Sequence, residues 1–241
     1  NEKSLTDPDS RLMSTANNSV EVCYNVQTVV DSKHSLIADY DVTNDPHDYG
    51  QLNEMSKKAK RIFKVKRIKV LADKGYYSTD DLNKCEKAGI LAYVAKPAVA
   101  NSTGEKEFYS DKFKYDKKEN VYICPANEKL YPSRERLKAK VKTRDYKNYT
   151  ACQRCEFKDE CTTSKKGRTI SRKLDQEILD RVDKRTKDNK ELYKKRQMIV
   201  EHPFGTIKRG FGFHYFLTRG LESVKTEASL TFFAYNFKRV I

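Results

Sequence analysis

Two acidic residues stand where this sequence could build a metal-dependent site. Asp73 follows the apolar run Ile68–Ala72 and precedes the pair Lys74-Gly75. In an α/β sheet, ligands bind at the carboxyl ends of strands, and a carboxylate there suits a hard cation. A strand-terminal Asp followed by Lys-Gly is also typical of a turn or helix cap. Asp73 alone therefore leaves both roles open.

Glu201 is the second acidic residue of interest, because it lies in an apolar-flanked helical stretch, Tyr193–Phe213. Lys208 follows seven residues later, which is nearly two helical turns, so both side chains share a face in a regular helix. An acid for a metal and a cation for a phosphate suit a protein that processes nucleic acid.

The charge of the chain points to the same class of partner. The 241 residues carry a formal net charge of +15 and a pI near 9.4, and the charge is clustered. Residues 57–69 hold eight Lys or Arg, and residues 134–149 mix basic residues with Tyr. Such segments suit phosphate contacts and base stacking, although a lysine-rich solvated surface is the alternative. No apolar run is long enough to span a membrane.

Four of the six cysteines gather in one region, 98–170, which has few aliphatic residues to build a core. Close thiol pairs of this kind are typical of structural zinc sites, and free thiols are the alternative. Cys23 and Cys85 stand alone in apolar or helical patterns and are expected to be small buried side chains. The four candidate zinc ligands are Cys124, Cys152, Cys155 and Cys161.

Alternating strands and helices predict an α/β layered sheet. After a polar arm at 1–20, strands are expected over 20–31, 35–43, 65–73 and 90–97, and helices over 49–63, 78–89, 174–198 and 224–241. Leu230, Phe233 and Phe237 share one face of the last helix. The predicted organisation is a first core part at 1–97, a cysteine-bearing insertion at 98–170, and a second core part at 171–241.

Several motifs together resemble bacterial insertion-sequence transposases of the DDE type. "VLADKGYYS" and "YxxR…VEHPFGTIKR" resemble the branch with a Tyr-Arg-Glu-Lys signature. Residues 24–52 are similar to the second and third strands of that family, and "RGLESV…AYNFKR" to its closing helix. The cysteine pattern resembles the insert of one sub-branch.

The resemblance implies a ribonuclease H-like fold, a mixed sheet flanked by helices. In this family three carboxylates hold two Mg²⁺ or Mn²⁺ ions for DNA cleavage and strand transfer. Asp73 matches the second acid and Glu201 the third, while Tyr193, Arg196 and Lys208 match the rest of the signature. The implied partners are transposon ends and target DNA, with a homodimer as the active form, in the nucleoid of the bacterial cytoplasm.

The first acid of the family lies upstream in an Asp-Gly-Thr motif that is absent from this sequence. The chain begins at Asn1 rather than Met, so it is expected to be a C-terminal portion. Asp31 is a substitute candidate, although its register matches the second strand of the family. A metal-dependent transposase and a non-catalytic DNA-binding remnant of one therefore both stay open.

The signature helix departs from the family in its spacing. Four residues separate Arg196 from Glu201, where the family has three. In a regular helix this spacing turns the two side chains about 140° apart. Pro203 is expected to bias His202 away from helix, and a kink there would restore the alignment.

Overall fold

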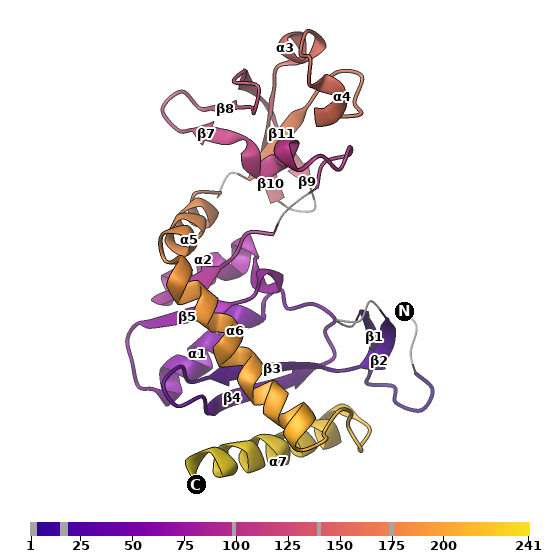
Figure 1. Cartoon of the computed structure of the whole chain (residues 1–241), viewed down its shortest axis with the longest axis vertical. Coiled ribbons are helices and arrows are strands. Elements are labelled where there is room, and N and C mark those ends of the chain that lie inside the picture. Colours follow the sequence, from indigo (N-terminus) through magenta and orange to yellow (C-terminus); the bar gives the residue numbers. More distant parts are fainter. Residues whose placement is uncertain (1–3, 15–18, 98–99, 139–140, 174–175) are drawn as a thin grey trace. The chain divides into compact units, whose positions relative to one another are not determined.

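The computed structural model describes residues 4–14, 19–97, 100–138, 141–173 and 176–241 (Figure 1). The chain divides into two compact units. Unit 1 contains Asn1–Ala95 and Arg181–Ile241, and unit 2 contains Lys96–Asp180. The sequence places these boundaries after residues 97 and 170. Ala98 and Leu174, where the insertion and the next helix are expected to begin, lie outside the described residues.

Unit 1 contains two separate strand pairs that share one helix. Strand β3 (Asn25–Val30) pairs antiparallel with β4 (Ile37–Thr43), and β5 (Ile68–Ala72) pairs parallel with β6 (Ile90–Val94). Helix α1 (Gln51–Ile62) contacts all four strands. This arrangement is a mixed α/β architecture, as predicted, but the described strands do not form one continuous sheet.

A third strand pair of unit 1 was not expected. Strand β1 (Arg11–Ser14) lies in the segment predicted as a polar arm and pairs antiparallel with β2 (Val20–Cys23). The strand predicted over 20–31 is therefore split at Tyr24. The hydroxyl of Tyr24 donates to the carboxylate of Asp7, which ties this break to the N-terminal segment.

The charged helix predicted over 174–198 is two helices. Helix α5 (Gln176–Asp188) ends before Asn189, and α6 (Lys190–Gly205) begins after it. The side chain of Asn189 donates to the carbonyl of Arg185 at 2.9 Å and so satisfies one of the last carbonyls of α5. A helix end capped in this way explains why the periodic pattern is interrupted. Helix α2 (Thr79–Lys87) lies close to its predicted position.

The closing helix, α7 (Leu221–Val240), has two apolar faces, and only one of them is buried. Leu230, Phe233 and Phe237 do share a face, but they are 66%, 69% and 60% exposed. The buried face of α7 is formed by Val224, Ala228, Phe232 and Tyr235, which follow one another at helical spacings of four, four and three residues. This face packs against β4 and the turn after α6. The core of unit 1 contains Ile37, Val42, Ile207, Val224, Ala228, Phe232 and Tyr235.

Unit 2 has a hydrophobic core of its own, so the prediction that it lacks one is wrong. Aromatic rings supply the area that aliphatic residues do not. The rings of Tyr122 and Tyr146 lie edge to face with centroids 5.0 Å apart. They are joined in the core by Phe113, Leu130 and Ile170.

A five-stranded sheet, in the order β11-β10-β9-β8-β7, carries this core. Its neighbouring strands are antiparallel. The elements of unit 2 are β7 (Lys114–Asp116), β8 (Val121–Ile123), β9 (Lys129–Lys138), β10 (Val141–Lys147), α3 (Tyr149–Gln153), α4 (Lys158–Cys161) and β11 (Thr169–Lys173). Among the residues described, no helix of either unit has the length and apolarity needed to cross a membrane.

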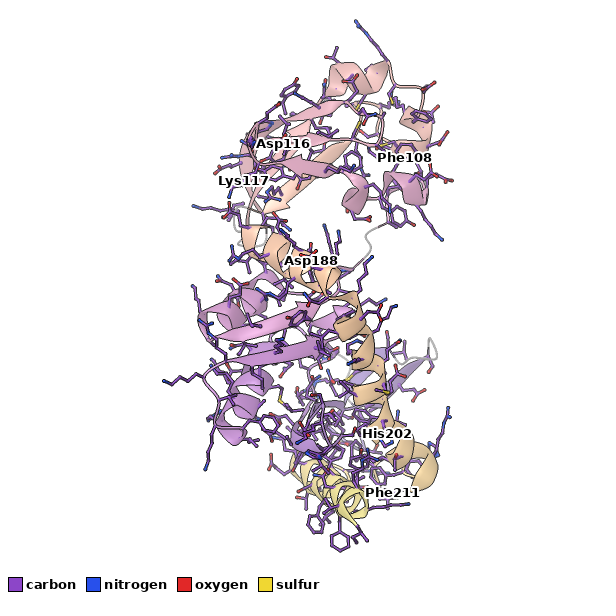
Figure 2. The ribbon with its side chains drawn as sticks, turned by 60° about the vertical axis from the view of Figure 1, so that its left-hand side comes forward. Phe108, Asp116, Lys117, Asp188, His202 and Phe211 are labelled. Atoms are coloured by element: carbon purple, nitrogen blue, oxygen red, sulfur yellow. The ribbon has the colours of Figure 1, made fainter. Side chains whose placement is uncertain are left out.

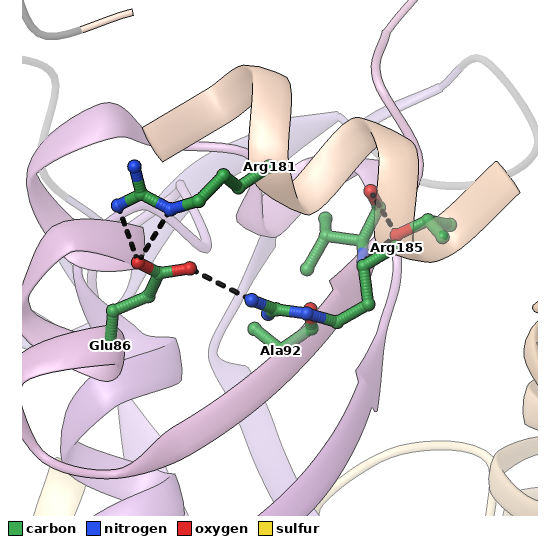
Figure 3. A network of polar contacts seen from close by, with 6 residues as sticks. Glu86, Ala92, Arg181 and Arg185 are labelled. Atoms are coloured by element: carbon green, nitrogen blue, oxygen red, sulfur yellow. Dashed lines mark hydrogen bonds and ion pairs between the residues drawn. The ribbon is translucent and has the colours of Figure 1, made fainter. Parts of the chain in front are cut away.

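Glu86 joins α2 to α5 through two arginines (Figure 3). Its two carboxylate oxygens accept from Arg181 at 2.7 Å and from Arg185 at 2.9 Å, and Arg185 also donates to the carbonyl of Ala92. Burial alone raises the pKa of Glu86, but the two guanidinium groups outweigh it and leave the pKa below its ordinary value. The ionised form is therefore favoured in the folded state.

Glu86→Gln is expected to lower the free energy of unfolding by about 1 kcal/mol at neutral pH, because it removes the charge that both arginines contact. A lowered folded pKa contributes stability above the unfolded pKa, roughly 4.3, and this contribution is lost as pH falls through the folded value. Urea unfolding of both proteins at pH 7 and pH 3.5 measures the difference. Glu191→Gln, which removes an exposed surface pair with Lys194, is the control and should change little.

Candidate active site

Asp73 lies directly after β5 and begins a single 3-10 turn, Lys74–Tyr76. Its Oδ1 accepts from the backbone N–H of Lys74 at 2.7 Å, so the capping role left open by the sequence is present. The side chain is nevertheless 53% exposed. A cap and a solvent-accessible carboxylate at the strand end therefore occur in the same residue.

Arg196 and Tyr193 of α6 lie at the same strand end. Arg196 Nη2 is 3.7 Å from Asp73 Oδ1. The hydroxyl of Tyr193 donates to the carbonyl of Ala72 at 3.1 Å and accepts from the N–H of Ala95 at 3.2 Å. One phenol thus joins α6 to the ends of β5 and β6. The structure brings together Asp73, Arg196 and Tyr193. In the sequence, the spacing of Tyr193 and Arg196 from Glu201 departs from the family signature, so they are less strongly predicted than Glu201 and Lys208.

Helix α6 runs through Pro203, so the predicted departure of His202 from helix is wrong. Figure 2 shows His202 on the continuous ribbon of this helix. Pro203 removes one backbone donor, but its ring is buried in unit 1, and this packing keeps the chain helical. The irregularity occurs after Gly205 instead, where Thr206–Gly210 forms a π-helical turn.

A continuous α6 leaves Glu201 on another face than Arg196. The two residues differ by about 140° around the helix and roughly 7.5 Å along it. Glu201 is exposed, whereas Arg196 is largely buried. No kink therefore turns Glu201 towards the strand end that holds Asp73.

Lys208 lies in the π-helical turn and is exposed. The α-helical spacing that places it on the face of Glu201 does not hold through this turn, because a π-helix has more residues per turn. Within unit 1, Lys208 lines a cleft of about 890 Å³ together with Asp48, Phe204 and His214. A lysine at the wall of an open cleft is available for a phosphate group.

Asp48 lies near Asp73, and no pattern in the sequence indicates it. Its Oδ1 accepts from Asn25 at 3.0 Å and from the buried Gln27 at 2.8 Å. A Cβ on Gly75 would lie 2.8 Å from Asp48 Oδ2, so glycine lets the turn after Asp73 approach this carboxylate without displacing it. The sequence places Asp48 in turn chemistry before α1, and the proximity arises from tertiary packing.

The carboxylates of the described residues do not complete a site for the divalent ions that the resemblance implies. No group of three or more His, Cys, Asp and Glu side chains is arranged to hold a metal ion in the part of the chain that the structure describes. Asp73 faces the guanidinium of Arg196, and Glu201 projects from α6 on another face. Asp31 is occupied in the β3–β4 turn, where its Oδ2 accepts from the N–H of His34 at 2.7 Å.

All six cysteines are free thiols. Cys85 is buried, as predicted, and Cys23 is only partly so. The other four belong to unit 2 and line a single small cavity.

Comparison with known proteins identifies one family. Residues 123–241, just under half of the chain, match a family model described as a transposase DDE domain. No curated protein and no solved structure matches the chain significantly. The matched segment contains Tyr193, Arg196, Glu201 and Lys208. Over this segment the chain is therefore similar to the DDE domain of transposases.

Proposed function

We propose that this chain forms most of the catalytic domain of a DDE transposase of the Tyr-Arg-Glu-Lys branch, which cleaves and joins DNA strands. The observation that carries the proposal is the position of α6. This helix lies within the matched family segment. Tyr193 and Arg196 attach it to the strand end that presents Asp73. A family-matched helix thereby meets a carboxylate from a distant part of the sequence.

In this proposal each signature residue has a separate role. Asp73 and Glu201 supply two of the three carboxylates that would hold Mg²⁺ or Mn²⁺, and Lys208 contacts a DNA phosphate. Arg196 and Tyr193 are positioning residues, because their contacts are with Asp73 and with the backbone of β5 and β6. Transposon ends and target DNA are the proposed partners, and a homodimer is the proposed active form.

The third carboxylate is proposed to come from an additional strand between β3 and β5. Among the described residues, β3 pairs only with β4 and β5 only with β6, so each has one free edge. Unpaired strand edges need hydrogen-bond partners. Because α1 contacts both pairs, a strand bonded to both edges would join them into one mixed sheet. Such a sheet would have the ribonuclease H-like form that the resemblance implies.

The alternative is a non-catalytic DNA-binding protein derived from the same kind of element. The observation in its favour is the incomplete set of acids among the described residues. Both functions predict DNA binding, because exposed basic residues gather between α1 and β5. They differ in what happens when the third acid is supplied.

The 241-residue chain alone is expected to bind supercoiled plasmid DNA but leave it uncut in Mg²⁺ or Mn²⁺, because Asp73 and Glu201 do not hold both ions without the third carboxylate. Conversion of supercoiled to nicked plasmid is the measurement. The chain extended in cis by a strand bearing the first acid should nick the DNA, and a failure of that extended chain favours the non-catalytic function. Nicking by the unextended chain, abolished by Asp31→Asn, would show that Asp31 is the first acid.

A further inference from the structure

Unit 2 contains a small cavity lined by four cysteines. They come from separate segments, since Cys124 follows β8, Cys152 belongs to α3, Cys155 follows that helix, and Cys161 ends α4. The cavity volume is about 40 Å³. This exceeds the roughly 10–15 Å³ that a single water needs, so one ion has room. Figure 2 draws sulfur atoms in yellow on the side of unit 2 that carries Phe108, a further lining residue.

The backbone around two of these cysteines is arranged to hold the sulfur atoms in place. Glu128 N–H donates to Cys124 Sγ at 3.3 Å, and Cys124 N–H donates to the carbonyl of Glu128 at 2.9 Å. Burial raises the pKa of the Cys124 thiol, and this backbone N–H offsets part of the rise. Gly167 has φ +121°, and a Cβ there would lie 2.9 Å from Cys152 Sγ. Only glycine allows this close approach, so Cys152 is held against the cavity.

A partly buried arginine lies at the same cavity. Arg168 is a lining residue, and its Nε is buried with no hydrogen-bond partner among the described residues. An unpaired buried donor of a charged group is costly, so its presence calls for a nearby negative charge. Lys158 lines the cavity as well. The cavity therefore combines four potential thiolates with two cations.

We propose that this cavity is a structural zinc site, in which Cys124, Cys152, Cys155 and Cys161 bind one Zn²⁺ and Arg168 offsets the negative charge of the complex. Zinc with four thiolates carries a net charge of −2, which the guanidinium of Arg168 and the ammonium of Lys158 at the same cavity offset. Thiolates select zinc over Mg²⁺ or Ca²⁺, which prefer oxygen ligands. Four protein ligands close the coordination sphere, so the site stabilises the fold rather than performing catalysis.

Zinc binding requires a local rearrangement. Among the described residues the four side chains are not grouped as a ligand set, and burial raises the pKa of the Cys161 thiol to about 11. Each of the four S–H groups must release a proton to solvent as its Zn–S bond of about 2.3 Å forms. The apparent affinity should consequently rise with pH.

The test is metal analysis of the full chain purified under reducing conditions without chelator. We expect one zinc per chain, and Co²⁺ in its place should give the absorption bands of tetrahedral thiolate coordination. Cys152→Ser should reduce zinc affinity at least tenfold, whereas Cys23→Ser, which alters a cysteine of unit 1, should leave it unchanged. Arg168→Gln should weaken zinc binding several-fold at unchanged stoichiometry.

Two outcomes would overturn the proposal. One is a reduced wild-type chain that binds less than one equivalent of Zn²⁺ at micromolar concentrations. The other is a Co²⁺ spectrum without sulfur-to-metal bands. Both readouts use the wild-type chain, so they decide the question even where the Cys152→Ser variant does not fold. Neither readout depends on DNA cleavage, so the result is independent of the proposed transposase function.

Discussion

Glu201→Gln is expected to lower DNA cleavage by at least about a thousandfold, or ~4 kcal/mol in the barrier, in the chain extended by the strand that bears the first acid. Glutamine keeps the size and shape of the side chain but removes its charge, and divalent cations of the Mg²⁺ class bind carboxylate oxygens in preference. Glu201 is exposed on α6, so the substitution should leave stability nearly unchanged. A loss of activity therefore reports on chemistry rather than on folding.

The measurement is the initial rate of plasmid nicking in Mg²⁺, with DNA affinity determined in parallel. Glu222→Gln is the matched control, because Glu222 is also exposed on a helix, α7, and should retain full activity. Asp73→Asn should match Glu201→Gln in its loss of cleavage. If the extended chain cuts DNA equally well with glutamine at position 201, Glu201 is not the third acid.

DNA affinity is expected to fall about a thousandfold between 50 and 200 mM salt, since a protein that neutralises roughly six phosphates releases a counterion at each. The net charge of +15 supplies enough basic residues, and several of them are exposed. Fluorescence anisotropy with a labelled duplex of arbitrary sequence measures the slope of log affinity against log salt. A slope close to zero would contradict binding through the phosphate backbone.

The basic segment between α1 and β5 is expected to provide a large share of that slope. Its exposed cations are Lys64, Lys66 and Arg67, with Lys69 just inside β5. Replacing all four with Ala should make the slope shallower by about three to four units if each contacts a phosphate.

A matched variant removes four lysines that each already face a carboxylate, so their charge is locally compensated. It replaces Lys57, Lys84, Lys112 and Lys194 with Ala. This variant loses the same net charge but should change the slope much less. Equal slopes for the two variants would show that net charge alone, and no particular surface, determines binding.

Elements with strong local patterns could be predicted from the sequence. The apolar run before Asp73 gives β5, and cap and Gly signals bound α2, because these features act within a few residues. The break at Asn189 and the split at Tyr24 could not be predicted in this way. Each depends on a side-chain hydrogen bond that hydropathy does not reveal.

The sequence indicates which residues belong to the candidate site, but not how they are arranged in space. The link between Tyr193 and the ends of β5 and β6 spans about half of the sequence, so no local rule indicates it. Pro203 illustrates the opposite error. Its local preference against helix is real, but burial of its ring outweighs that preference. Tertiary packing likewise produced the aromatic core of unit 2 from a segment with few aliphatic residues.

Because α6 is a continuous helix, the number of residues between two positions determines the angle between their side chains around the helix axis. Because Tyr193 fixes one end of the helix to two strand ends, every later side chain has its direction set by its distance in sequence from that anchor. Deleting one residue between Arg196 and Glu201 would turn the rest of the helix by about 100°. That turn would bring the carboxylate towards the face of Arg196, and it would also rotate the buried Pro203 and Ile207 out of the core. The length of the segment between Arg196 and Glu201 is therefore fixed by the strand attachment before it and by the core contacts after it. This segment should tolerate substitutions far better than insertions or deletions.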